Sequence, residues 1–186
     1  MVPSDVPAVR LLEAAAEALR QEALSLPDAG FVAMPSTERY TGAWKGFLLG
    51  AGRWEHEFPT VDFPANRAQC PVATAVLAAI PDVTVAGYLR LEPGADLGLH
   101  TDDREDDVIR VHLALQLPPD EAAYWPVGTA RLLDVRVPHA ATNPSTEPRV
   151  TFVVDVRLPA PVPVGAVPAW GPPVVEEAPA APESAT

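Results

Sequence analysis

The sequence contains a single cysteine, Cys70, so no disulfide can form within the chain. It also contains no run approaching the roughly 18 consecutive apolar residues of a membrane-spanning helix. These absences exclude a disulfide-stapled framework and disfavour any membrane partner. Because one thiol without a partner suits a reducing compartment, we expect a cytoplasmic protein.

Basic residues are scarce: 13 Lys and Arg stand against 25 Asp and Glu, which gives a net charge of −12. Such a surface repels phosphate backbones, so we expect no nucleic-acid partner. A length of 186 residues favours one domain with its own core, which we place at residues 1–158. Residues 159–186 are dense in Pro and Ala without a period, which predicts a largely disordered tail.

Helix signals come early in the chain. Apolar residues recur at helical spacing over residues 5–25, where Asp5 can cap the helix and Pro7 suits its first turn. A second, short helix is predicted over residues 71–80, which begin with proline. Residues 36–69 are rich in aromatic side chains and in glycine-containing turns, and they predict short strands.

The second half of the chain alternates between polar and apolar residues, which predicts strands over residues 83–92, 108–117, 129–137 and 149–157. Several strands at short spacing predict a mainly β fold, either a sandwich or a cupin-like jelly roll, with flanking N-terminal helices. Arg110 and His112 share one face of the second strand. Alternation leaves open whether that face meets water or lines a pocket between two sheets.

Histidine is rare, and three of the four histidines fall in this β-rich half. His100, Asp102 and His139 together offer two nitrogens and one oxygen, the ligand set of the facial triad that holds non-haem Fe(II). Asp103 is the competing carboxylate, but the His-x-Asp spacing favours Asp102. His56 lies between two glutamates and is most simply a surface residue.

A fixed cation follows the last of these residues, because Arg149 lies ten positions after His139 at the start of a predicted strand. A guanidinium there can hold the far carboxylate of a 2-oxo acid whose other end binds the iron. The same ligands also fit a cupin-like metal site without a 2-oxo acid, as in an isomerase or a non-catalytic binding module. Zinc is a third option, although the sequence has no HExxH motif.

The segment from Tyr40 to Leu158 resembles the aspartyl/asparaginyl β-hydroxylase family of Fe(II)/2-oxoglutarate oxygenases. Four groups of residues carry the resemblance, in the family's order: Tyr40-Thr-Gly-Ala-Trp44-Lys-Gly-Phe-Leu-Leu; Leu91-Glu-Pro-Gly94 followed by His100; Arg110-Val-His112-Leu-Ala-Leu; and Gly128 through Leu133-Asp134 to His139, Asn143 and Arg149. Matching motifs in the expected order are more specific than any single one.

The resemblance implies a double-stranded β-helix, which is a jelly roll, with iron on His100, Asp102 and His139. It implies that O2 and 2-oxoglutarate are consumed while a C–H bond of an amino acid, free, peptidyl or tethered, is hydroxylated. It further implies that 2-oxoglutarate is held by Arg149 at one end and by Arg110 and His112 nearer the metal.

Two departures from the family pattern matter. Members that act on protein domains have Gly at the position of Asp102, so this chain is more similar to the bacterial small-molecule branch. The segment 132–135 is looser than the family's run there. Trp44 and Trp125 are candidates for the lining of the substrate pocket.

Overall fold

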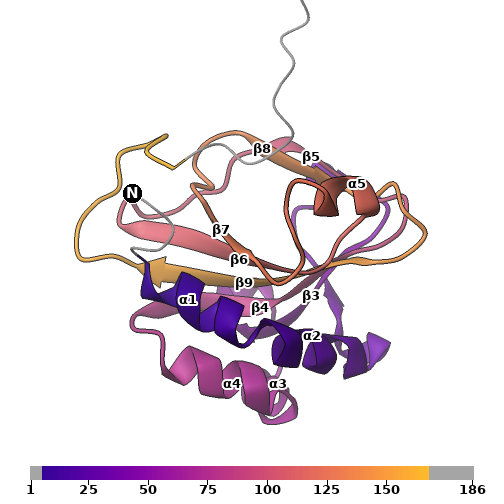
Figure 1. Cartoon of the computed structure of the whole chain (residues 1–186), viewed down its shortest axis with the longest axis horizontal. Coiled ribbons are helices and arrows are strands. Elements are labelled where there is room, and N and C mark those ends of the chain that lie inside the picture. Colours follow the sequence, from indigo (N-terminus) through magenta and orange to yellow (C-terminus); the bar gives the residue numbers. More distant parts are fainter. Residues whose placement is uncertain (1–5, 168–186) are drawn as a thin grey trace, which may run out of the picture.

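A computed structural model describes residues 6–167 as two antiparallel sheets with helices against the larger one (Figure 1). The predicted mainly β fold with flanking helices is thereby confirmed. The larger sheet has the order β1-β3-β4-β9-β6-β7, and the smaller has the order β2-β5-β8.

The elements have the following bounds. The larger sheet contains β1 (Val32–Ala33), β3 (Trp44–Gly50), β4 (Val83–Leu91), β6 (Val108–Gln116), β7 (Ala130–Leu133) and β9 (Arg149–Arg157). The smaller sheet contains β2 (Tyr40–Thr41), β5 (Asp96–His100) and β8 (His139–Thr142). The helices are α1 (Pro7–Ala14), α2 (Ala16–Ser25), α3 (Phe63–Gln69), α4 (Pro71–Ala78) and α5 (Pro119–Ala122), with 3₁₀ turns η2 (Asp28–Gly30), η3 (Thr37–Arg39) and η4 (Gly52–Glu57).

The strands predicted over residues 83–92, 108–117 and 149–157 correspond to β4, β6 and β9, which are neighbours at the centre of the larger sheet. Every residue of β6 except Gln116, and every residue of β9 except Arg157, is buried. Both faces of these strands are therefore covered, one by helices and the other by the smaller sheet. The polar face of β6 does not meet bulk water.

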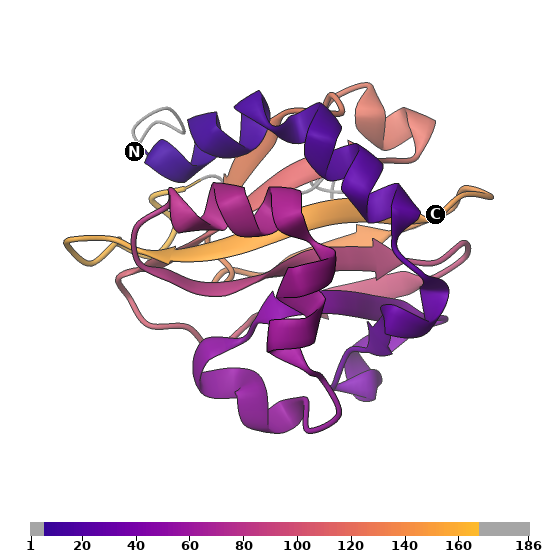
Figure 2. The ribbon, with the colours of Figure 1, turned by 90° about the horizontal axis from the view of Figure 1, so that it is seen from below.

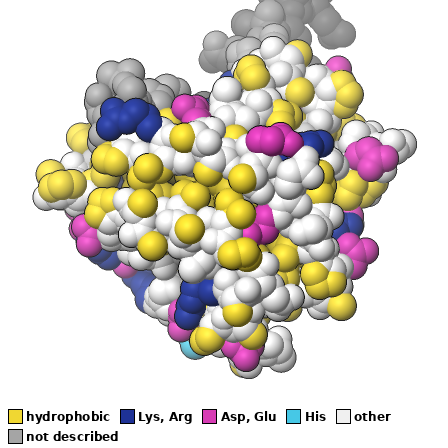
Figure 3. All heavy atoms as spheres, turned by 60° about the horizontal axis from the view of Figure 1, so that its bottom comes forward, with side chains coloured by type: hydrophobic (Ala, Val, Ile, Leu, Met, Phe, Trp, Pro, Cys, Tyr) yellow, Lys and Arg dark blue, Asp and Glu magenta, His cyan; other side chains and the backbone are white. Residues whose placement is uncertain are grey.

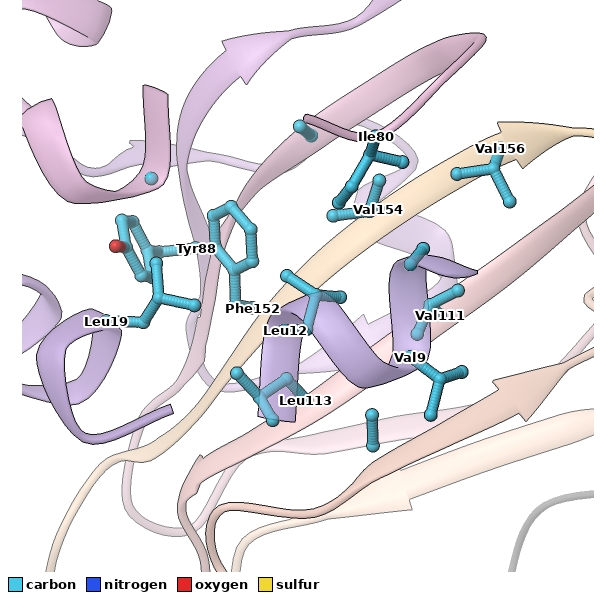
Figure 4. Close-up of a cluster of buried hydrophobic side chains, with 14 of the residues drawn as sticks. Val9, Leu12, Leu19, Ile80, Tyr88, Val111, Leu113, Phe152, Val154 and Val156 are labelled. Atoms are coloured by element: carbon cyan, nitrogen blue, oxygen red, sulfur yellow. The ribbon is translucent and has the colours of Figure 1, made fainter. Parts of the chain in front are cut away.

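The main core lies between the larger sheet and the N-terminal helices (Figures 2 and 4). Leu12 of α1 and Leu19 of α2 are fully buried there, against Tyr88 of β4 and Phe152 of β9. The rings of Tyr88 and Phe152 lie 4.7 Å apart between centroids. Burial of such large apolar side chains contributes about 1.5–3 kcal/mol each to the stability of the fold.

A buried carboxylate also joins the helices to the sheet. Glu22 of α2 accepts hydrogen bonds from the backbone N–H groups of Val72 and Ala73 at the start of α4, at 2.7 and 3.0 Å. It also accepts one from the Tyr88 hydroxyl at 2.7 Å. Because every partner donates to it, this buried charge is stabilised where it would otherwise be costly.

Three predicted elements need correction. The strand predicted over residues 129–137 is the four-residue β7, which ends at Leu133. The single helix predicted over residues 5–25 is two helices, α1 and α2, which are separated at Ala15 (φ −100°, ψ 4°). The predicted cap Asp5 lies outside the described residues. Residues 36–69, predicted as short strands, form β2 and β3 but also η4 and α3. The Asp62 side chain begins α3 by accepting from the Ala65 N–H at 2.9 Å, a cap that the aromatic composition obscured.

The first residues of the predicted tail follow the surface of the domain. Val162 and Val167 are buried, and the Val162 N–H donates to the Asp106 carbonyl at 2.7 Å. Residues 168–186 lie outside the described part of the chain. On the face that carries the helices, apolar side chains reach the surface among scattered charged ones (Figure 3). Within residues 6–167, every helix is too short or too polar to span a bilayer.

Candidate metal centre and its two cavities

The three predicted ligands come together at one end of the smaller sheet. The antiparallel register of β5 and β8 places His100 directly opposite His139, and their ring centroids are 4.2 Å apart. Asp102 follows two residues after β5, where its backbone N–H donates to the Val135 carbonyl at 2.8 Å. One ligand atom from each of the three residues lies within 4.8 Å of the others, close enough for one metal ion.

Both histidine rings are oriented by the backbone. Nδ1 of His100 lies 2.7 Å from the Gly98 carbonyl, and Nδ1 of His139 lies 3.0 Å from the Val137 carbonyl. A carbonyl partner requires the proton on Nδ1, which leaves the lone pair of Nε2 available for a metal ion. Burial also lowers the pKa of His139, which favours the neutral imidazole that a metal needs.

Asp102 is held as a carboxylate by two arginines. Its Oδ2 accepts from Nη1 of Arg110 at 3.0 Å, and its Oδ1 accepts from Nη1 of Arg39 at 3.2 Å. Burial acts to raise the pKa of Asp102, but the charges of Arg110 and Arg104 outweigh it and lower that pKa. Asp103 has an 81% exposed side chain, pairs with Arg53 at 3.1 Å and lies outside the cluster.

A second carboxylate, Asp155 on β9, lies beneath this pair and is fully buried. Nε and Nη2 of Arg110 donate to its two oxygens at 2.6 and 2.9 Å, and Nε of Arg104 donates to it at 2.9 Å. Arg110 therefore bridges Asp155 and Asp102 with a single guanidinium. The bidentate contact fixes the plane of that guanidinium, and through it the position of Oδ2 of Asp102.

Two cavities meet at this centre, and Asp102, Arg110 and Trp44 line both. The small cavity has a volume of about 40 Å³ and lies between the sheets. Its wall contains the three candidate ligands and, in addition, His112, Arg149 and Thr151. The large cavity has a volume of about 370 Å³ and is bounded by η3, η4, β3 and β4. The polar face of β6 is thus part of a pocket wall.

The remaining predicted site residues lie around the small cavity. Burial first, and then the charges of Arg110 and Arg149, hold the pKa of His112 well below its usual value, so this ring is neutral. Arg149 donates through Nε and Nη2 to Glu121 of α5 at 2.8 and 2.9 Å. Thr151, two residues further along the same face of β9, has a buried hydroxyl with no hydrogen-bond partner among the described residues.

Other residues fall outside or behind the centre. Trp44 lines both cavities, whereas Trp125 is fully buried behind His112 and Arg149 and lines neither. His56 is exposed on η4, as predicted.

The sequence did not single out Asp155, Arg39 or Glu121 as site residues. Only Asp155 carried a signal, because strand alternation places it on the same face as Arg149.

The fold and the cluster define a class: a mainly β protein with a His-Asp-His group that could hold a metal ion, in a pocket between two sheets. The sequence profile of the aspartyl/asparaginyl β-hydroxylases matches residues 13–159, which is most of the chain. The chain belongs to the aspartyl/asparaginyl β-hydroxylase family. No curated protein sequence matches it significantly.

Solved structures give weaker likenesses. AviO1 from Streptomyces viridochromogenes Tue57 is 19% identical over 88% of both chains, with a TM-score of 0.40. A prolyl-4-hydroxylase from Pseudomonas putida is 15% identical over 82% of this chain and 88% of its own, also with a TM-score of 0.40. A predicted oxalate decarboxylase from Thermotoga maritima is 10% identical over 69% and 92%, with a TM-score of 0.34. At these TM-scores and identities, we draw no conclusion about function from the similar structures.

Removing the carboxylate ligand should abolish metal binding selectively. Loss of a residue that only supports a metal ligand typically weakens metal binding about 10–100-fold. Asp102→Ala removes a ligand itself, so we expect a larger loss of affinity for Mn(II) or Fe(II). Asp103→Ala is the matched control and should bind metal like the parent protein, because its side chain points outward. Anaerobic calorimetric titration measures both, and equal losses in the two variants would contradict this ligand assignment.

The buried ion pair between Asp155 and Arg110 should contribute more to stability than an exposed Asp–Arg pair. Asp155→Asn leaves the Arg110 charge buried without its main partner, so we expect the free energy of unfolding to fall by about 3–5 kcal/mol. Asp107→Asn disrupts the more exposed contact with Arg157 at 2.6 Å and should lower the free energy of unfolding far less. Urea unfolding compares the two variants, and similar costs would show that Asp155 has no special structural role.

Proposed function

We propose that this protein is an Fe(II)/2-oxoglutarate-dependent dioxygenase that hydroxylates a C–H bond of an amino acid, free, peptidyl or tethered. In this proposal the two sheets are the halves of a double-stranded β-helix. The observation that carries it is the position of the His100–Asp102–His139 group at the junction of two cavities. One cavity would admit the co-substrate and the other the substrate.

The donor set fits iron. Two neutral imidazoles with Nε2 available and one ionised carboxylate are the ligands of the facial triad, which leaves coordination positions for co-substrate and O2. Iron bound there would supply the activation of O2, at the expense of 2-oxoglutarate, for attack on an unactivated C–H bond. The protein's own part is to hold Asp102 ionised through Arg110 and to shield the centre between the sheets.

The lining of the small cavity suits a 2-oxo diacid. Arg149 and Thr151 present a guanidinium and a hydroxyl from one face of β9, a pair that would bind the far carboxylate. Arg110 and neutral His112 lie on the adjacent strand β6 and would donate hydrogen bonds to the end nearer the metal. The buried Thr151 hydroxyl supports this placement, because a buried polar group without a partner is costly unless a ligand satisfies it.

Binding of 2-oxoglutarate would require a larger cavity and displacement of the present partner of Arg149. A cavity of about 40 Å³ holds about three water molecules, so its walls must separate to admit a five-carbon diacid. The guanidinium that would bind its far carboxylate already faces a carboxylate on α5, because Glu121 pairs with Arg149. We therefore place the required movement in α5, the element that carries this counter-ion.

Turnover of the co-substrate tests the proposed function. With Fe(II), O2 and ascorbate, the protein should convert 2-oxoglutarate to succinate, and Arg149→Ala should abolish this while iron remains bound. Arg131→Gln is the matched control, since Arg131 stacks on the same Trp125 ring at 5.5 Å but lines neither cavity. Succinate formation at the parent rate in Arg149→Ala would remove Arg149 from the site. Iron binding without any succinate from the parent protein would favour the cupin-like isomerase or binding module.

Thr151→Val separates a ligand-binding role from a structural one. Valine has the same shape but no hydroxyl, so the melting temperature of the ligand-free protein should stay the same or rise. The Kd for 2-oxoglutarate should increase about 10-fold, because one hydrogen bond to a charged group is lost. Calorimetric titration of the Mn(II)-loaded protein measures this, and an unchanged Kd would place the carboxylate elsewhere.

A further inference from the structure

The large cavity has an apolar body. Its volume of about 370 Å³ lies within the range of small-molecule sites. Apolar side chains from β3, β4, η4 and β9 cover much of its wall, including Trp44, Leu48, Trp54, Phe58, Leu89 and Val153. A ligand that fills it must therefore present substantial hydrocarbon or aromatic surface.

The charged side chains of this cavity are balanced, unlike those of the chain as a whole. Three arginines, Arg39, Arg104 and Arg110, oppose three carboxylates, Glu57, Asp102 and Asp103, whereas the full sequence carries a net charge of −12. A divalent metal on Asp102 would make this wall positive. The cavity would then attract an anion in a protein whose overall charge repels anions.

The three arginines differ in how firmly they are held. Arg110 and Arg104 both donate to the buried Asp155. The Arg39 side chain, on η3, is 37% exposed, which places it at the mouth of the cavity. Among the described residues it donates one hydrogen bond, to Oδ1 of Asp102 at 3.2 Å, with Glu38 further away at 3.8 Å. Arg39 is therefore the arginine of this cavity that is easiest to redirect.

The one hydrogen-bond acceptor of Arg39 is also the oxygen that faces the metal position. Oδ1 of Asp102 lies 3.8 Å from Nε2 of His100, the nitrogen assigned to the metal, whereas Oδ2 is held by Arg110. A metal ion on Oδ1 would compete with the Arg39 guanidinium and repel its charge. Metal loading would thus release a cation at the mouth of an apolar cavity.

We propose that the large cavity binds a small carboxylic acid with an apolar or aromatic body, and that Arg39 pairs with its carboxylate once a metal occupies Asp102. This inference rests on the proposed function for the identity of the cavity as the substrate site, but binding of the acid requires neither O2 nor 2-oxoglutarate. A carboxylate near Arg39 would leave the apolar body along the wall that Trp44 and Leu89 share with the metal centre.

Calorimetric titration with a matched pair of probes tests the proposal. The Zn(II)-loaded protein should bind 3-phenylpropionate about 10- to 100-fold more tightly than 3-phenylpropionamide, because a hydrogen bond between two charged groups exceeds its neutral counterpart. Arg39→Gln should remove this preference by weakening the acid alone. Arg10→Gln, an exposed position on α1 across the sheet, is the control and should keep it.

Two further arms identify the site. The preference for the acid should shrink in metal-free protein, where Arg39 returns to Asp102. Saturating 2-oxoglutarate should leave binding of 3-phenylpropionate intact, since the two acids would occupy different cavities; competition between them would overturn the proposal.

Equal binding of acid and amide to the parent protein, or an unchanged preference in Arg39→Gln, would also overturn it. Failure of the proposed function is recognised separately, as absence of succinate formation.

Discussion

The buried ion pair between Asp155 and Arg110 is the interaction on which the site depends. A fully buried carboxylate is expensive unless it is paired and hydrogen-bonded, and Arg110 meets both of its oxygens while Arg104 adds a third contact. Burial acts to raise the pKa of Asp155, yet the charge of Arg110 lowers it, so the carboxylate stays ionised. The remaining donor of Arg110 then fixes Asp102, and the candidate metal ligand is ionised and oriented before any metal arrives.

The Arg110 side chain lines both cavities, which differ in size and in the residues that bound them. The small cavity contains Arg149, Thr151 and neutral His112, which lie on adjacent central strands. The large cavity has two tryptophans in its wall and a cation at its mouth. Under the proposed function, this separation would let 2-oxoglutarate bind beside the metal while the substrate enters the other cavity.

Much of this arrangement could be predicted from the sequence, because it follows from local periodicity and from scarce residue types. Alternation placed β4, β6 and β9 to within about a residue, and the rarity of histidine drew attention to His100 and His139. The pairing of β5 with β8, which brings those histidines face to face, is a long-range contact that no local pattern encodes.

The ion-pair partners of Arg149 and Arg39 could not be predicted from the sequence either. Glu121 lies in a short helix after two prolines, and only the folded chain brings it to Arg149. Arg39 precedes a two-residue strand and reaches Asp102 across a sequence separation of 63 residues. The interruption between α1 and α2 at Ala15 contains neither proline nor glycine, so the apolar periodicity of residues 5–25 predicted one continuous helix.

The most direct test of the central claim is anaerobic spectroscopy of the metal centre. Fe(II) is added to the purified protein, followed by 2-oxoglutarate, and the visible metal-to-ligand charge-transfer band is recorded. We expect a band in the parent protein and none in His139→Ala, because chelation of 2-oxoglutarate requires iron held by the full ligand set. Iron binding by the parent protein without a band on addition of 2-oxoglutarate would contradict it.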